Sequence, residues 1–522
     1  MGTRSLLQNA VLLVLGLSAA VMMVHGFASF PGLHADEAWA GLRALEHMER
    51  GFFTLHGMRF YAGSLYPYVL SLVFKAQGAS VASLRLPGLV LNVVGLGILL
   101  GVLLRQSARS AGLFVALCCT CLLLLLEARI GWEVMAWNLF GMACLVVVAR
   151  AFLVRGNSSA LTALLFFAVS LVGVLNHFVF VSWSLAFALA SAVLWWPGRA
   201  TAFTTRFFLL NAVGLAQVFI VCVLQWKLDD ASFQRHPTWV LCSLVALPLV
   251  STGLWWALVP AFERHTPALQ AGGSAWMERL RVRRPHVWLL WGLAPFLIMH
   301  AVGLTGVLGN DVLYRRLFGA VPSLPLRVAG LLFVGVWIAA VGAACVRAIR
   351  AFRFDASDTH GAFWALVLPL YAACFPLFTS RESPRHYLLL TMALFYAGAL
   401  LVPDYLARFR TRLFTVTLVF AAVTQAVAWW NLTAPLRPPL DFRIGWRRET
   451  SRHLQDITPI YELLKREGIC HYQGEFFIQQ PLEFLRQADA WNCSNPAVAT
   501  VEYCPTCEST FFFSVRTQPL PR

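Results

Sequence analysis

Long apolar runs separated by short polar joints dominate the first 430 residues of the chain. A helix that crosses the roughly 30 Å hydrocarbon core of a bilayer needs about 20 mostly apolar residues. Thirteen runs fit this requirement, and we predict a transmembrane helix for each. They cover residues 8–28, 83–104, 111–127, 132–149, 159–176, 178–197, 207–226, 238–261, 287–308, 326–346, 361–379, 386–402 and 413–430. The pattern predicts an all-α polytopic membrane module over residues 1–430.

The first run has a second interpretation. Gly26-Phe27-Ala28 would serve as a cleavage site for a secretory signal peptide. The apolar stretch before it is longer than the apolar region of such signals usually is. We therefore interpret it as an uncleaved span.

Residues 29–82, between the first two runs, form a long connection with a different pattern. Leu42, Leu45 and Met48 recur at helical spacing, and charged residues fill the positions between them. This pattern is typical of an amphipathic helix that lies in the membrane interface. Residues 66–77 are apolar but too short to span, so we expect a second interfacial helix there.

The last segment, residues 431–522, is polar and mixes helix and strand signals. Residues 448–467 favour a helix. Four short runs favour strands, namely residues 469–473, 476–479, 498–503 and 510–515. We predict a small soluble α/β domain attached to the membrane module.

Composition and charge agree with this division. The chain is 59% apolar and 13% charged, whereas soluble domains carry about 25% charged residues, which excludes a soluble multidomain protein. The net charge of +16 does not indicate nucleic-acid binding. Only three of the basic residues are lysines, and the arginines occur in small clusters between apolar runs. Such clusters are typical of topology signals.

The same charges predict an orientation. With the N-terminus in the cytoplasm, the inner segments hold 18 basic and five acidic residues, and the outer loops hold 13 basic and ten acidic residues. This bias satisfies the positive-inside rule, and thirteen spans then place the tail outside. Because arginine greatly exceeds lysine, we expect a GC-rich bacterial source. We therefore predict a bacterial inner (cytoplasmic) membrane protein with a periplasmic or extracellular C-terminal domain.

The most distinctive polar motif is His34-Ala35-Asp36-Glu37, just beyond the first span. A carboxylate at the membrane interface can act as a general base, because burial and neighbouring groups tune its pKa. Alternatively, Asp36 caps the following helix, with Glu37 near the positive end of its dipole. Glu133 is either a second acid of the same site or the end of a span paired with Arg129.

Arginines on the predicted outer face are a second candidate feature, because the positive-inside rule depletes them there. Arg381 and Arg385 lie in the loop that leads to Tyr387. Guanidinium groups bind phosphate oxygens well, so a phosphorylated lipid head group is a natural partner. The alternative is an ordinary loop in which one arginine pairs with Glu382. Other basic residues on the predicted outer face are weaker candidates for phosphate binding, since each side chain could simply extend to the membrane interface. They are Lys75, Arg85, Arg315 and Arg316.

The four cysteines of the tail are Cys470, Cys493, Cys504 and Cys507. In an oxidising compartment such cysteines favour structural disulfides, and sequence does not choose among the three possible pairings. A single CxxC with scattered partners is a poor zinc signature. No nucleotide-binding or zinc-protease motif occurs, no cofactor or metal ligand set is indicated, and the use of a divalent metal stays open.

The order of these motifs resembles the GT-C superfamily of membrane glycosyltransferases. Asp36-Glu37 follows the first span, as in the acidic signature of that superfamily. Three further matches follow, at residues 61–68 with 78–80, at residues 84–87 and at residues 383–389. The branch most similar is that of protein O-mannosyltransferases and aminoarabinose transferases. Two departures occur: Ser64-Leu65-Tyr66-Pro67 replaces the Glu-Lys-Pro-Pro run of the aminoarabinose branch, and His386 separates Arg385 from Tyr387.

This resemblance implies a glycosyltransferase that uses a polyprenyl-phosphate-linked sugar, hexosyl or pentosyl, at the outer face of the membrane. The acceptor hydroxyl would belong to a lipid, a glycan or a protein, and transfer would invert the anomeric centre. Asp36 would be the base and Glu37 would orient it. The lipid phosphate would be held by Arg85, Arg381, Arg385 and Tyr387.

Two other classes of protein fit the composition. A multi-pass transporter or lipid flippase usually has ionisable groups near mid-membrane, whereas here they gather at the outer rim. A membrane scaffold would leave the placement of Asp36-Glu37 unexplained. Release of polyprenyl phosphate from a labelled donor would distinguish an enzyme from both.

Overall fold

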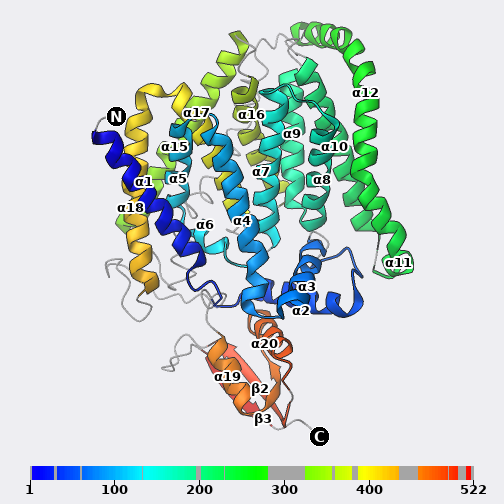
Figure 1. The fold of residues 1–522 in the computed structure, drawn as a ribbon, viewed down its shortest axis with the longest axis vertical. Coiled ribbons are helices and arrows are strands. Elements are labelled where there is room, and N and C mark those ends of the chain that lie inside the picture. Colours follow the sequence, from blue (N-terminus) through cyan, green and yellow to red (C-terminus); the bar gives the residue numbers. More distant parts are fainter. Residues whose placement is uncertain are drawn as a thin grey trace.

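The computed structural model describes residues 3–28, 32–58, 62–131, 133–195, 202–228, 230–279, 324–354, 359–378, 386–433, 457–491, 493–503 and 513–518. These residues form a bundle of long helices, with a smaller unit below one end of it (Figure 1). The bundle helices before the large gap are α1 (Thr3–Val24), α4 (Val81–Leu104), α5 (Ala108–Thr120), α6 (Leu122–Glu127), α7 (Glu133–Leu153), α8 (Ala160–Asn176), α9 (Val179–Trp195), α10 (Ala202–Lys227) and α12 (Pro237–Arg279). Those after it are α15 (Leu324–Phe354), α16 (Thr359–Cys374), α17 (Tyr387–Tyr405) and α18 (Ala407–Thr433).

Twelve of the thirteen predicted spans coincide with these helices. The ninth, residues 287–308, lies outside the described residues. Residues 111–127 form two helices, α5 and α6, because Cys121 leaves the helical conformation with φ −102° and ψ 86°. In the described part of the chain, seven helices are long and apolar enough to cross a membrane, and four shorter ones are apolar. The chain is thus a mainly helical, multi-pass membrane protein.

The predicted interfacial helices are present in the connection between the first two spans. They are α2 (Ala35–Arg50) and α3 (Leu65–Gln77), and both lie at the end of the bundle that faces the tail (Figure 1). The helices pack against each other and enclose a small apolar core that includes Ala38, Ala44, Tyr66 and Leu70. A short helix, α11 (Asp230–Arg235), precedes α12 at the same end.

The tail is an α/β unit, as predicted. Its elements are α19 (Thr458–Arg466), β1 (Ile469–Gln473), α20 (Phe476–Ala488), β2 (Asn495–Tyr503) and β3 (Phe513–Gln518). The sheet order is β1-β2-β3, with β1 parallel and β3 antiparallel to β2. Its own core joins Ile460, Ile469 and Val501. Residues 448–456 of the predicted tail helix lie outside the described residues, so only its end is seen, as α19.

One predicted strand of the tail is wrong. Residues 476–479 begin helix α20 instead. The apolar residues continue at helical spacing, and they serve two cores: Ile478 and Leu482 are buried in the tail, whereas Phe484 is buried against α2. A four-residue window shows only the apolar run, and the helical period appears only over the full thirteen residues.

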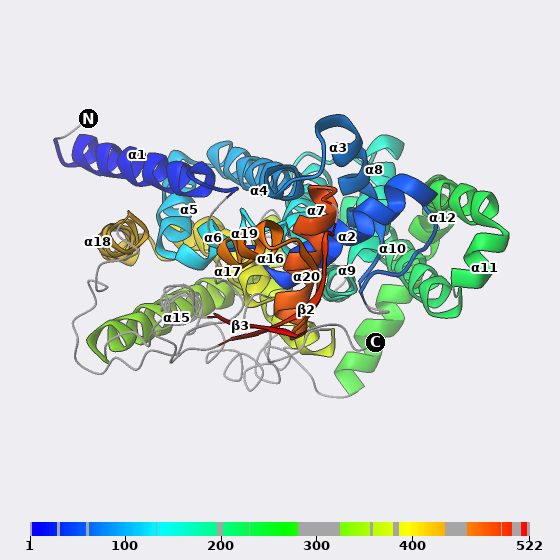
Figure 2. The ribbon, with the colours of Figure 1, turned by 90° about the horizontal axis from the view of Figure 1, so that it is seen from below.

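Helix α20 brings the tail close to the bundle. It contacts α2 directly, and a view from the tail side shows α19, α20 and the sheet in front of the middle of the bundle (Figure 2). At the end of the bundle that faces the tail, α2 therefore lies between the spanning helices and the tail.

Candidate active site

The chain enters α2 through a capping box formed by its distinctive motif. His34 is the N-cap: its Nδ1 accepts from the Asp36 backbone N–H at 3.1 Å, and its own N–H donates to Glu37 Oε1 at 2.8 Å. Such reciprocal bonds satisfy donors that the first turn of a helix leaves unpaired. The alternative interpretation of Asp36 as the cap is wrong, because the cap lies two residues earlier.

Glu37 is completely buried at the centre of a polar cluster. Besides the His34 N–H, its carboxylate accepts from Arg85 through Nε at 3.0 Å and Nη2 at 2.5 Å. The backbone N–H of Gly131, in the joint between α6 and α7, donates to Oε2 at 2.9 Å. Four donors on three chain segments therefore fix this carboxylate.

Arg85, on the first turns of α4, is also completely buried. Among the described residues its acid partner is Glu37, and it donates further to the carbonyl oxygens of Phe27 at 2.8 Å and Gly32 at 3.2 Å. Both carbonyls belong to the connection from α1 to α2. The bidentate geometry is the strong form of an arginine–carboxylate pair, and it locks α4 to the start of α2.

Asp36 has a different environment from its neighbour. Its side chain keeps 24% exposure, and its Oδ2 lies 3.5 Å from His34 Nδ1. Consecutive residues of a helix point about 100° apart, so Glu37 faces α4 while Asp36 lies at the edge of the cluster. The two adjacent acids are thus one buried, ion-paired carboxylate and one that solvent or a substrate can reach.

Arg129 adds a second buried guanidinium, for which the sequence indicated only a pairing with Glu133. It donates to the carbonyls of Met22 at 2.7 Å and His25 at 2.5 Å, at the end of α1. A cation at a helix C-terminus satisfies carbonyls that lack a partner within the helix. Glu133 is the first residue of α7, and its side chain is outside the described part of the structure.

A belt of contacts joins α2 to the end of α8 and to the start of α17 at this end of the bundle. His47 bonds Ser64 Oγ through Nε2 and the Gly51 carbonyl through Nδ1, both at 2.7 Å. Burial lowers the pKa of His47, so a neutral ring makes these bonds. The Gly63 N–H donates to the carbonyl of Asn176 at 2.8 Å. A Cβ on Gly63 would collide with the backbone of Leu175, so only glycine permits this approach.

The belt continues to the motif at the start of α17. The buried rings of His177 and His386 lie with centroids 5.8 Å apart, and Tyr387 packs beside Phe375 at 5.5 Å. No local sequence pattern indicates that these two histidines meet, because 208 residues separate them in the chain. Arg381 and Arg385 lie outside the described residues.

The tail cysteines divide into a described pair and a pair outside the described residues. Cys470 and Cys493 form a disulfide with their Cα atoms 5.5 Å apart, whereas Cys504 and Cys507 lie outside. The bond links the start of β1 to the segment that follows α20. Within the described ranges, no group of three or more His, Cys, Asp or Glu side chains is arranged to hold a metal ion.

No protein-family profile and no curated protein sequence matches the chain. Among solved structures, it is similar to ArnT from Cupriavidus metallidurans bound to undecaprenyl phosphate, at 14% identity and a TM-score of 0.35, covering 98% of this chain and 97% of that one. The apo state of ArnT gives 14% identity and a TM-score of 0.34, with 97% of both chains covered. The oligosaccharyltransferase of Archaeoglobus fulgidus, in complex with Zn and sulfate, gives 15% identity and a TM-score of 0.42. The match covers 83% of this chain and 57% of that one.

Proposed function

We propose that the chain is a membrane glycosyltransferase, which moves a sugar from a polyprenyl-phosphate-linked donor to an acceptor hydroxyl at the outer face of the membrane. The observation that carries this proposal is the contrast between the two acids at the start of α2. Glu37 is fixed by Arg85, Gly131 and the His34 N–H, while Asp36 beside it keeps 24% exposure. A reaction that needs one accessible base held in a rigid frame explains this arrangement.

In the proposed reaction, Asp36 accepts the proton of the acceptor hydroxyl as its oxygen attacks the anomeric carbon. The bond between that carbon and the phosphate oxygen breaks, and the phosphate leaves with the electron pair. Attack opposite the leaving group inverts the anomeric centre. Arg381, Arg385 and Tyr387 are proposed to bind the departing phosphate, since stabilising developing negative charge lowers the barrier.

Arg85 receives a different role from phosphate binding, which the family resemblance implied for it. Its donors are directed to Glu37 and to two backbone carbonyls in a completely buried site. We therefore assign Arg85 and Glu37 as positioning residues, which hold the start of α2 so that Asp36 keeps its place.

In the proposed topology, this reaction takes place at the outer face of the membrane. The N-terminus would be cytoplasmic, and α2, α3 and residues 431–522 would lie on the outer side, where a lipid-linked sugar and its acceptor meet. The domain division that we propose is a membrane module over residues 1–430 and a tail domain over 431–522.

The test is release of polyprenyl phosphate from a radiolabelled polyprenyl-phosphate sugar by the purified full-length protein in nanodiscs. Asp36→Asn should lower this release by about 10²–10⁴-fold, because a placed general base contributes that much. Asp404→Asn is the control: Asp404 is exposed, lies in the last turn of α17 and accepts only a bond from Gln106 at 3.1 Å among the contacts described. It should leave release unchanged.

Turnover of Asp36→Asn near that of the unaltered protein would contradict the assignment. Movement of the intact lipid-linked sugar across the bilayer, without cleavage of its phosphate bond, would point instead to a transporter or flippase.

A further inference from the structure

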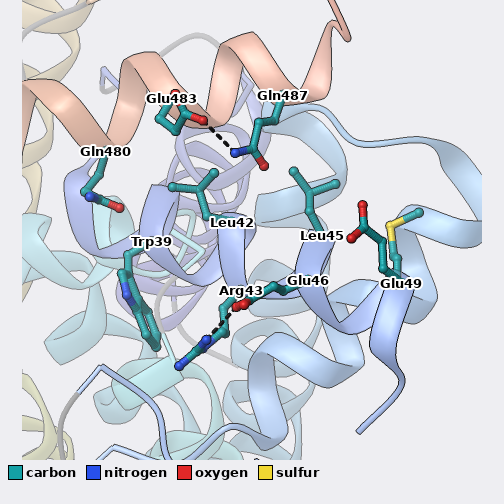
Figure 3. A pocket seen from close by; sticks show the side chains of 10 residues that line it. Trp39, Leu42, Arg43, Leu45, Glu46, Glu49, Gln480, Glu483 and Gln487 are labelled. Atoms are coloured by element: carbon teal, nitrogen blue, oxygen red, sulfur yellow. Dashed lines mark hydrogen bonds and ion pairs between the residues drawn. The ribbon is translucent and has the colours of Figure 1, made fainter. Parts of the chain in front are cut away.

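A cavity of about 770 Å³ lies between the interfacial helix α2 and the tail helix α20. In Figure 3, Leu42 and Leu45 extend from α2 toward α20, and Gln480, Glu483 and Gln487 come from α20 above them. We call this cavity the α2–α20 groove; its remaining lining residues are Trp39, Arg43, Glu46, Met48 and Glu49. It is formed by two segments that are more than 400 residues apart in the sequence.

The groove begins close to the proposed base. Trp39 is three residues after Asp36 on the same helix, which is about one turn, or about 4.5 Å along the axis. From Trp39 to Glu49 the lining continues for ten residues, or about 15 Å. Asp36 does not line the groove itself, but it lies about one helical turn beyond the end marked by Trp39.

The lining combines an apolar floor with hydrogen-bonding groups at its edges. The floor consists of Leu42, Leu45 and Met48 with the half-buried indole of Trp39, and the edges carry three carboxylates and two amides. Saccharides present both apolar C–H faces and many hydroxyl groups, and binding sites pair apolar or aromatic surface with a few placed polar groups.

The carboxylates that line the groove disfavour an anionic ligand, and the pairing of two of them with arginine weakens their attraction for a cationic ligand. Glu46 is paired with Arg43 at 2.5 Å and Arg50 at 3.5 Å. Glu483 accepts from Arg486 Nε at 3.0 Å and from Gln487 at 2.6 Å. Burial alone would raise the pKa of Glu483, but bonds from Arg486, Tyr472 and Gln487 outweigh it and lower the pKa to about 2. Glu46 and Glu483 are therefore charge-compensated acceptors, which suit neutral hydroxyl donors, while Glu49, the third carboxylate of the lining, lies exposed at the end of the groove.

We propose that the α2–α20 groove is the binding site for a neutral oligosaccharide, which is the acceptor of the transfer reaction. This inference rests on the proposed function, and it deepens it by naming the acceptor class. The saccharide would lie along α2 with its reactive hydroxyl at the Asp36 end.

Binding is tested separately from catalysis. The probe is a panel of free neutral oligosaccharides, from the chitin, maltose and mannan series, presented to the full-length protein in nanodiscs. We expect saturable binding of at least one series. Gln487→Trp, which fills the groove from α20, should weaken it at least tenfold, and Trp39→Ala should weaken it similarly. Gln479→Trp is the matched control, because Gln479 is exposed on α20 and does not line the groove.

The outcomes separate the two proposals. Asp36→Asn should retain binding while it loses transfer; if it loses neither, the proposed function fails while the saccharide site stands. Absence of binding to every series would overturn the inference, as would equal binding by Gln487→Trp and Gln479→Trp. Preference for phosphorylated or amine-bearing saccharides would overturn the neutral class. A second arm with the bound saccharide attached to lipid in the same nanodisc distinguishes a glycolipid acceptor from a free glycan.

Discussion

At the scale of single residues, the central result is that two adjacent acids have opposite environments. Glu37 is buried with Arg85 and a backbone N–H, whereas Asp36 stays partly exposed. The difference follows from helix geometry and from the position of α4, which covers one side of α2. A buried carboxylate is tolerated only when it is paired and hydrogen-bonded.

Loss of Arg85 should therefore strongly destabilise the protein. Arg85→Met leaves the Glu37 charge buried without its partner, and removing one member of a buried pair costs about 3–5 kcal/mol. Thermal unfolding in detergent micelles should show a lowered midpoint. The double variant Glu37→Gln with Arg85→Met should recover part of the loss, because no unpaired charge remains.

The control for that prediction is Arg105→Met at the opposite end of α4, where the arginine is exposed. It should leave the midpoint unchanged. If Arg85→Met unfolds at the same temperature as Arg105→Met, the ion pair does not hold the start of α2.

At the scale of elements, helix α20 joins the tail to the bundle, and the contact of Phe484 with α2 is especially close. Phe484 is completely buried against Gly41 of α2, and a Cβ on Gly41 would lie 2.6 Å from Phe484 Cδ2. Real Cβ atoms do not approach a neighbour so closely, so any larger side chain must push the ring away. The tail has a separate core around Ile460 and Val501, which this contact does not involve.

Gly41→Ala should consequently loosen α20 without unfolding the tail sheet. We expect hydrogen exchange of the α20 amides to accelerate by about tenfold or more, since a lost docking contact lowers the free energy of local opening. Exchange in β2 should stay close to that of the unaltered protein. The measurement is hydrogen–deuterium exchange with mass spectrometry on the full chain.

Gly97→Ala is the matched control, because a Cβ at Gly97 of α4 meets nothing within 4 Å. It should leave α20 exchange unchanged. Equal exchange in the two variants would show that Gly41 is not needed for docking of Phe484.

At the scale of the whole molecule, the charge of +16 is best understood as a topology signal. Most of the excess positive charge lies on segments that the span count places inside. The structure gathers α2, α3, α11 and the tail at one end of the bundle (Figure 1), so one orientation decides the side for all of them. The positive-inside rule predicts that this end lies outside.

The orientation predicts which residues a membrane-impermeant thiol reagent reaches in spheroplasts. On a background without other reactive cysteines, Gln479→Cys in the tail should be labelled in intact spheroplasts. Arg105→Cys, between α4 and α5, should be labelled only after permeabilisation. Both side chains are exposed, so burial does not decide the result. The reverse labelling pattern would invert the topology and move the proposed site to the cytoplasm.

What the sequence by itself determined is the part of this protein that depends on local pattern. The spans follow from the length of the apolar runs, because each helix must cross the hydrocarbon core by itself. Helices α2 and α3 follow from the helical spacing and the length of their apolar runs, because these patterns are visible in each segment alone. The Asp36-Glu37 motif was also recognisable from the sequence.

Only the tertiary structure decided which of these residues meet. The pairing of Glu37 with Arg85, the contact of His177 with His386, and the docking of Phe484 on Gly41 each join segments that are distant in the chain. No local pattern encodes such partners, since they depend on how the helices pack. The helix that begins at residues 476–479 was missed for a different reason: its helical period appears only over the thirteen residues of α20, and a four-residue window shows an apolar run alone.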